Sequence, residues 1–204
     1  MLTALLDIKR TLIMGVLNVT PDSFSDGGDY FGLDKALGRA HDMVKEGADV
    51  IDVGGESSRP GSRPVSVDEE KRRVLPVLEK LVDELDVPLS VDTRRSQVAQ
   101  MALDLGVRIV NDITALRDDL EMARVVARFD AHVVIMHMKG TPADMQHNPH
   151  YEDLMGELVD FFEDRVQVAR RSGISDGNNI LDPGIGFGKR VGDNFTILKN
   201  LGRI

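Results

Sequence analysis

Three observations in the sequence predict an α/β fold of the (β/α)8 barrel type. Short runs rich in Val, Ile and Leu recur six times, as expected for strands buried on both faces. A helical spacing of apolar residues follows each run, and this alternation indicates a parallel sheet with right-handed crossovers. Polar residues end each run. This third feature favours a barrel over a doubly wound open sheet, which has the same alternation of strands and helices.

The expected elements can be placed in chain order. The strands lie within residues 11–19, 48–57, 87–93, 107–113, 132–138 and 178–188. The helices lie within residues 33–47, 66–85, 95–106, 120–130, 151–173 and 193–201. Ser66 and Glu69 have capping-box spacing, so the second helix is expected to begin there.

The polar residues at the strand ends favour a barrel over a doubly wound open sheet. They are Asn18, Glu56, Asp92, Asn111 with Asp112, His137 and Asp182. A barrel gathers the carboxyl ends of all its strands into one mouth, where active sites lie. An open sheet would concentrate such residues near one switch point. The first strand is not followed by G-x-G-x-x-G, and no P-loop motif is present.

Composition limits the class of protein. We expect one domain over residues 1–204, because this length suits a single core. The net charge of −9 argues against a nucleic-acid partner, which needs a basic face. The chain has no cysteine, no signal-peptide pattern and no apolar run near the ~20 residues of a membrane span. We therefore expect a cytoplasmic protein without a membrane partner.

Two long motifs carry a family resemblance. "IMGVLNVTPDSFSDGG" and "GADVIDVGGESSRPGS" resemble the two signatures of the dihydropteroate synthase family, the sulfonamide targets of folate biosynthesis. "SVDT", "VNDI", "MHMKGTP" and "ILDPGIGFGK" follow in the family's order, so the resemblance covers essentially the whole chain. It implies a (β/α)8 barrel and a transferase that joins 6-hydroxymethyl-7,8-dihydropterin pyrophosphate to p-aminobenzoate. Pyrophosphate leaves, assisted by Mg²⁺.

The residues can support pterin recognition. A pterin edge offers both N–H donors and acceptor atoms, so it calls for carboxylates and for an amide that can do both. Asp92 and Asp182 supply carboxylates at strand ends, and Asn111 supplies the amide. Ile113 and Met136 would form apolar walls. The resemblance assigns all five to the pterin pocket.

The leaving pyrophosphate needs a metal ion and cations. The resemblance gives Asn18 the role of Mg²⁺ ligand, and a side-chain carbonyl oxygen suits that hard ion. Arg59 offers a guanidinium for phosphate or carboxylate oxygens. Ser58 offers a hydroxyl and an N–H where many relatives have Thr, and we expect this change to have a small effect.

The resemblance also implies an aminobenzoate site. Phe24 would pack on the aminobenzoate ring, with Pro60 and Phe187 as further walls. From its place in the motif, Asp26 is expected to hold a partner of the leaving or attacking group. With Asn18 and Arg59, it completes the expected catalytic set.

Two further residues lie near these motifs. His137 tempts an assignment as base or metal ligand, but its neighbours lack ligand spacing and the attacking amine is already nucleophilic. We expect it to have a structural role beside the site. Lys189 either borders the pterin or is an ordinary surface lysine.

The expected strands number six, whereas a barrel of this kind typically needs eight strands and ~250 residues. We therefore expect the C-terminal two β/α units to be absent. In the family these carry a Ser-x-Lys and an Arg-x-His pair. The first and last strands would then have exposed edges, which a homodimer formed by edge pairing would cover.

Three functions stay open at this point. The first is dihydropteroate synthase, and the second is a truncated non-catalytic pterin-binding module or pseudoenzyme. The third is a pterin-dependent methyltransferase domain, which shares the pterin pocket but has no use for the Asn18 loop or Arg59.

Overall fold

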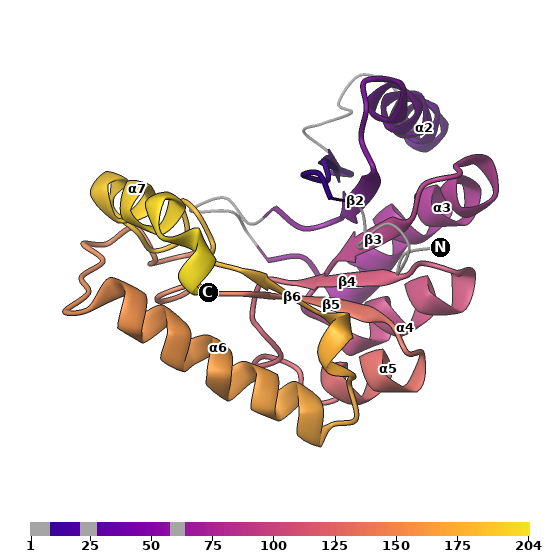
Figure 1. Cartoon of the computed structure of the whole chain (residues 1–204). Helices are drawn as coiled ribbons and strands as arrows, with labels where there is room; N and C mark the ends of the chain where they lie inside the picture. The colour runs from indigo at the N-terminus through magenta and orange to yellow at the C-terminus, as the bar shows by residue number, and fades with distance from the viewer. Residues whose placement is uncertain (1–8, 21–27, 58–63) are drawn as a thin grey trace. The chain divides into compact units, whose positions relative to one another are not determined.

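The computed structural model describes residues 9–20, 28–57 and 64–204, and within them strands and helices alternate (Figure 1). The strands are β1 (Met14–Asn18), β2 (Val50–Gly54), β3 (Leu89–Asp92), β4 (Ile109–Asp112), β5 (His132–Met136) and β6 (Asn179–Asp182). The helices are α2 (Gly28–Lys45), α3 (Val67–Glu84), α4 (Ser96–Leu105), α5 (Met122–Arg128), α6 (Leu154–Arg171) and α7 (Val191–Lys199), with short 3₁₀ turns η2 (Asp176–Asn178) and η3 (Leu201–Arg203). The predicted α/β order of six β/α units is confirmed over the described ranges.

The chain divides into two compact units. The first holds Pro64–Asn111 and the described residues up to Ser57, and the second holds Asp112–Ile204. Each unit has its own buried apolar side chains, such as Ile51 and Leu78 in the first and Ile135 and Leu158 in the second. A single domain over residues 1–204 stays a prediction.

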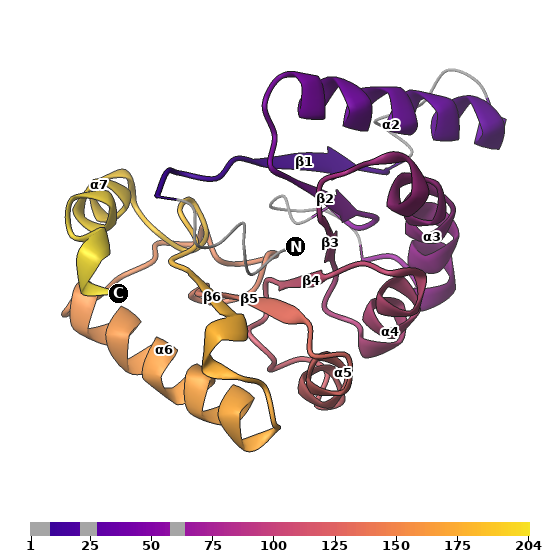
Figure 2. The same cartoon turned by 45° about the vertical axis from the view of Figure 1, so that its right-hand side comes forward.

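The first unit is a parallel sheet with helices on one of its faces. Strand β2 pairs with β1 and with β3, and β3 pairs with β4, all in parallel. Helix α2 packs along β1, and α3 packs between α2 and α4 (Figure 2). Ile51, Val53 and Val91 are completely buried. Gly15 lets α2 approach β1, because a Cβ there would lie 3.0 Å from Met43 Sδ.

The start of α3 follows from its sequence as predicted. Ser66 Oγ accepts a hydrogen bond of 3.2 Å from the backbone N–H of Glu69. Three acidic residues fill the first turn of the helix, where they interact favourably with the helix dipole.

Strands β1 and β6 differ from the expectation of burial on both faces. Within β1 only Leu17 is buried, while Met14 and Val16 are exposed. The reason is that β1 has one neighbouring strand in its unit and one helix-covered face. All four residues of β6 are half-buried. The predicted burial on both faces is therefore wrong for these two strands.

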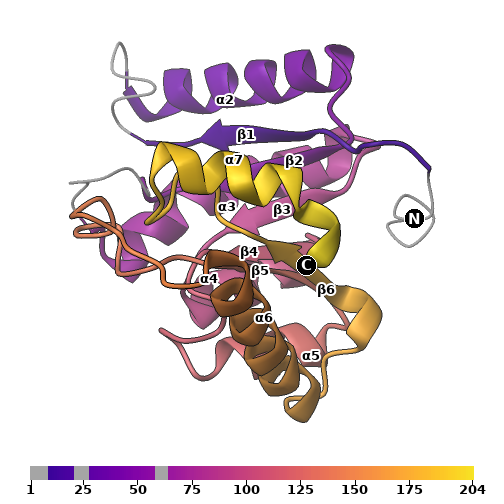
Figure 3. The same cartoon turned by 60° about the vertical axis from the view of Figure 1, so that its left-hand side comes forward.

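The second unit contains the parallel strand pair β5 and β6 and the helices α5, α6 and α7. Helix α6 packs against β6, and Phe162 is buried on its inner face (Figure 3). Helix α7 buries Ile197 but leaves Val191 and Phe195 mostly exposed. In the described part of the chain, none of the helices combines the length and the hydropathy needed to cross a bilayer.

Candidate active site

One row of the first unit's sheet collects three of the predicted site residues. Asn18 pairs with Gly54, Gly54 with Asp92, and Asp92 with Asn111, each in parallel register. Side chains at paired positions project from the same face of a sheet, so this row presents an amide, a carboxylate and a second amide together. All four residues lie at the carboxyl ends of their strands, where a barrel enzyme places its chemistry.

Gly54 makes room within this row. A Cβ at Gly54 would lie 3.2 Å from Asp92 Oδ2 and 3.3 Å from Asp92 Cβ. Both distances are tighter than ordinary van der Waals contact, so a Cβ here would require the Asp92 side chain to shift by a few tenths of an ångström. The glycine therefore fixes the space in which Asp92 lies.

Asn111 is held by a residue that the sequence analysis missed. Its Nδ2 donates a hydrogen bond of 2.8 Å to Asp52 Oδ2, and Asp52 is only 2% exposed. Burial raises the pKa of the Asp52 carboxyl, and hydrogen bonding by the side chains of Ser90 and Asn111 opposes that shift. The available signal was an acidic residue in the middle of an otherwise apolar buried strand, which is rare without a specific partner.

An ion-pair network ties the segment after β2 to the segment before α3. Arg95, in the connection after β3, donates to Glu56 at 2.8 Å and also pairs with Glu70, which is 1% exposed. The guanidinium donates further to the Val65 carbonyl oxygen at 2.5 Å, and the Val65 N–H lies 3.3 Å from Glu56. Glu56, predicted to line the mouth, therefore serves as an anchor for this network.

The polar residue that ends β6 is Asp182, and it lies beside Met136. The two occupy paired positions on β5 and β6, so their side chains project from one face. Asp182 Oδ1 accepts a hydrogen bond of 2.7 Å from the backbone N–H of Gly184. This hydrogen bond from Gly184 to Oδ1 stabilises the turn after β6, as an Asp side chain before a proline commonly does.

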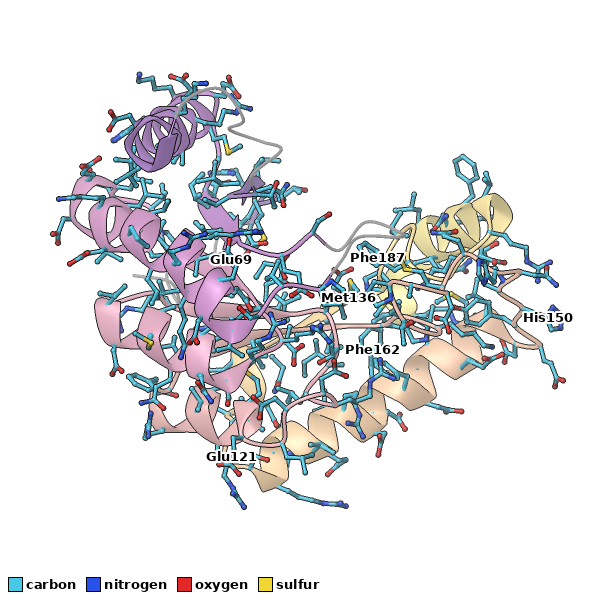
Figure 4. The ribbon with its side chains drawn as sticks, turned by 180° about the vertical axis from the view of Figure 1, so that it is seen from behind. Glu69, Glu121, Met136, His150, Phe162 and Phe187 are labelled. Atoms are coloured by element: carbon cyan, nitrogen blue, oxygen red, sulfur yellow. The ribbon has the colours of Figure 1, made fainter. Side chains whose placement is uncertain are left out.

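The predicted apolar walls of the second unit come together. Met136, Met138 and Met145 form a buried cluster, and Ile113 and Phe187 pack against it. Figure 4 shows Met136 and Phe187 close to one another. Thioethers adapt to irregular shapes, so this cluster suits a flat ring at its edge.

Lys189 is buried, which excludes the surface-lysine alternative that the sequence left open. Its Nζ lies 3.0 Å from His137 Nδ1, 3.2 Å from the His137 carbonyl oxygen and 3.0 Å from the Phe187 carbonyl oxygen. Burial lowers the pKa of Lys189 to about 8. Burial, with the charge of Lys189, lowers the pKa of His137 to about 3, so His137 is a neutral acceptor. This agrees with the structural role expected for His137.

The loop between β6 and α7 packs directly on the backbone after β5. Gly184 and Gly188 have φ of +65° and +64°, a region that favours glycine. A Cβ at either would clash with the carbonyl oxygens of His137 and Lys139, respectively. The glycines of this motif therefore permit close backbone approach.

Asp112, also expected at the mouth, is used within its own loop. Its Oδ1 accepts from the N–H and the hydroxyl of Thr114, at 2.8 and 2.7 Å, and its Oδ2 accepts from the N–H of Leu116 at 2.8 Å. Ala115 and Leu116 have positive φ, and these hydrogen bonds hold them there. Asp112 thus orders the loop that carries Ile113.

Five predicted residues lie outside the described part of the chain. They are Phe24, Asp26, Ser58, Arg59 and Pro60. Among the described residues, no group of three or more His, Cys, Asp or Glu is arranged to hold a metal ion. Mg²⁺ binds through one or two protein oxygens and the phosphates of a substrate. The exposed amide of Asn18 at the end of β1 fits that mode.

Alternating parallel strands and helices, with polar side chains at the carboxyl ends of the strands, define an enzyme-type α/β fold of the barrel class. The sequence profile of the family described as "Pterin binding enzyme" matches residues 14–204. The chain belongs to this family, and the relatives described below are dihydropteroate synthases.

Three relatives illustrate the likeness. The dihydropteroate synthase of Synechocystis is 46% identical over 193 residues, which is 95% of this chain and 67% of that protein. A solved dihydropteroate synthase from Clostridium difficile, in the presence of pteroic acid, is 50% identical with a TM-score of 0.87, over 95% of this chain and 71% of that one. The Xanthomonas albilineans enzyme with 4-aminobenzoic acid is 43% identical with a TM-score of 0.88, over 96% and 69%.

These likenesses confirm the family resemblance and the barrel-type fold class predicted from the sequence. The chain spans about two thirds of the length of the relatives that it matches.

Proposed function

We propose that this chain acts in folate biosynthesis as a dihydropteroate synthase, condensing 6-hydroxymethyl-7,8-dihydropterin pyrophosphate with p-aminobenzoate. The observation that carries the proposal is the row of Asn18, Gly54, Asp92 and Asn111 at the carboxyl ends of β1–β4. The family membership of residues 14–204 supports the same reaction class.

In the first unit, pterin recognition is assigned to the polar row. The Asp92 carboxylate would accept hydrogen bonds from pterin N–H groups, and the Asn111 amide would both accept and donate. The family resemblance assigns Asp182 the same kind of contact. Ile113 and Met136 would contact the faces of the ring, because they belong to one apolar cluster.

Departure of pyrophosphate is assigned to Asn18, Ser58 and Arg59. Asn18 would offer its side-chain oxygen to Mg²⁺, which when bound supplies charge neutralisation for the leaving phosphates. The Arg59 guanidinium would bind phosphate oxygens, and the Ser58 hydroxyl would donate to them. The two assignments after β2 rest on the family resemblance.

The aminobenzoate site is assigned to Phe24, Pro60 and Phe187, with Asp26 near the reacting groups. The neutral amine attacks the pterin methylene carbon, so a C–N bond forms while the C–O bond to pyrophosphate breaks, and the amine then loses a proton. Phe187 packs on the methionine cluster, which supports its assignment as a wall.

The proposal includes a cytoplasmic location and a homodimer. The absence of cysteine supports a reducing compartment. The exposed apolar side chains Val191, Phe195 and Leu198 on α7 support self-association. Analytical ultracentrifugation of the purified chain tests the homodimer.

Turnover tests the proposed function. The chain is incubated with the pterin pyrophosphate, p-aminobenzoate and Mg²⁺, and dihydropteroate is measured by chromatography. The matched control is Asn18→Ala, whose exposed side chain contributes little to the fold. Product well above that of the Asn18→Ala variant supports the synthase.

Two other results would not support a synthase. Pterin binding without product would support a non-catalytic pterin-binding module, and absence of both would contradict the proposal. A methyltransferase receives no support from the relatives named above, all of which are dihydropteroate synthases.

A further inference from the structure

The hydrogen bond between Asn111 and Asp52 reaches across an intervening strand. Asn111 lies on β4 and Asp52 on β2, and the residue between them on β3 is Ser90, the register partner of Asp52. Ser90 is completely buried and small enough to let the two longer side chains meet above it. The contact links the row that carries Asn111 and Asp92 to the Asp52 carboxyl group, which lies two residues before Gly54 on β2.

The amide of Asn111 has two distinct sides, and Asp52 faces one of them. An amide donates through nitrogen and accepts through oxygen, and rotation about its last bond exchanges the two. A carboxylate opposite the amide accepts hydrogen bonds, so it draws the nitrogen toward itself. The 2.8 Å distance from Nδ2 to Asp52 Oδ2 is that arrangement. The carbonyl Oδ1 and the second N–H are then turned away from Asp52.

Because Asp52 is buried, breaking its hydrogen bond with Asn111 is energetically unfavourable. Asp52 is 2% exposed, and its other oxygen, Oδ1, has no hydrogen-bond partner among the described residues. The hydrogen bond to its Oδ2 comes from Asn111, and the neighbouring Ser90 hydroxyl also lowers the pKa of this buried carboxyl group. Losing the Asn111 hydrogen bond would leave Oδ2 as a buried acceptor without its amide donor, which is destabilising.

We infer that Asp52 is a positioning residue for pterin recognition, which holds the Asn111 amide in one orientation so that its oxygen and second N–H meet the ligand in a fixed order. The inference rests on the proposed function for the role of Asn111 as a pterin contact. Asp52 itself does not touch the ligand in this account, because it is buried below the row.

Two substitutions at Asp52 separate the effect of its hydrogen bond with Asn111 from the effect of its side-chain volume. Asp52→Asn keeps a carbonyl oxygen that can accept from Asn111 Nδ2, and its new N–H₂ can donate to the unpartnered Ser90 Oγ. Asp52→Leu keeps the approximate volume and removes the acceptor. By calorimetry with 6-hydroxymethylpterin, we expect Asp52→Asn to bind within about twofold of wild type and Asp52→Leu about tenfold more weakly.

A double-mutant cycle identifies the route of the effect. If Asp52 acts through Asn111, then Asp52→Leu weakens pterin binding in the wild-type background but has no further effect in an Asn111→Ala background. A residue that only supports the fold would weaken binding equally in both. Ser90→Ala is the matched control, since it removes the other polar side chain beside Asp52 and leaves the hydrogen bond from Asn111 in place. Thermal melts show which variants are folded.

A measurement without ligand keeps the inference separate from the proposed function. In the ¹⁵N–¹H spectrum of the ligand-free chain, we expect one Asn111 side-chain proton to be shifted and slow to exchange in wild type and Asp52→Asn, and not in Asp52→Leu.

Each result decides one of the two claims. Wild-type failure to bind pterin would contradict the proposed function, and the amide signals would then decide the positioning alone. Equal amide signals in wild type and Asp52→Leu would overturn the inference, as would additive losses in the double-mutant cycle.

Discussion

The ammonium nitrogen of Lys189 lies 3.0 Å from His137 Nδ1, in the interior of the second unit. Its two further hydrogen bonds go to backbone carbonyl oxygens of His137 and Phe187. One buried lysine thus joins the end of β5 to the loop after β6, which carries a wall of the candidate site. The contact requires His137 to be neutral, since a protonated ring could not accept from an ammonium group.

The neutral His137 predicts a loss of stability in mild acid. Its folded pKa is about 3, so between that value and 6.5 the unfolded chain binds more protons than the folded one. The free energy of unfolding therefore falls as pH drops below 6.5, by at most about 1.4 kcal/mol per pH unit from this group. His137→Asn keeps an acceptor for Lys189 and removes the titration. Urea unfolding at pH 7 and pH 5 should show a shallower loss for the variant, and equal slopes would contradict the assignment.

The lowered pKa of Lys189 predicts a gain of stability in mild alkali. Its folded pKa of about 8 lies below the ordinary 10.5, so the unfolded chain binds more protons within that window. Stability contributed by this group therefore rises as pH increases from about 8 to 10.5. Lys189→Met should be less stable at pH 7 by about 2 kcal/mol, because it leaves buried acceptors unpaired. The difference in unfolding free energy between wild type and variant should widen from pH 7.5 to 9.5, and a constant difference would rule out the lowered pKa.

The ion pair of Arg95 and Glu70 predicts strong coupling. Glu70 is 1% exposed, so Arg95→Gln leaves a buried carboxylate without its cation. We expect a loss of about 3 kcal/mol, and recovery of more than half of it when Glu70→Gln is added. Arg124→Gln, in the exposed pair with Glu121, is the control and should cost less than about 0.5 kcal/mol. Additive losses for Arg95 and Glu70 in denaturant unfolding would refute the coupling.

Gly54 predicts a steric effect on the candidate site. Gly54→Ala would place a Cβ 3.2 Å from Asp92 Oδ2 and shift the carboxylate by a few tenths of an ångström. Pterin affinity should fall about tenfold, the size of one lost charged hydrogen bond. Gly38→Ala, on α2 with nothing within 4 Å of the new Cβ, is the matched control and should not change affinity. Equal affinities for the two variants, by calorimetry, would show that Asp92 does not need this space.

The strand ends were predictable because an apolar run that stops at a polar residue can be recognised in the sequence alone. Asn18, Asp92 and Asn111 were found that way, and the register places them in one row. Asp52 was not found, because its partner is two strands away and a sequence does not show which strands lie side by side. Its burial and hydrogen bond appear only once β2, β3 and β4 are assembled.

The remaining differences have a similar cause. Val16 was taken as buried because its run is apolar, but burial of both faces also needs neighbours on both sides of the strand. The role of Lys189 was left open between pocket and surface, because two of its three acceptors belong to His137, which is distant in the sequence. Lysine is seldom buried, and the sequence alone gave no partner for it.

The most direct test of the account is a calorimetric titration of 6-hydroxymethyl-7,8-dihydropterin pyrophosphate with Mg²⁺ into the chain and into Asp92→Asn. The substitution keeps the shape of the side chain and removes the charge that would accept pterin N–H groups. The account predicts binding by the wild-type chain and at least about tenfold weaker binding by Asp92→Asn, with the same melting temperature within a few degrees. Equal binding by the two would contradict the assignment of the polar row as the pterin site.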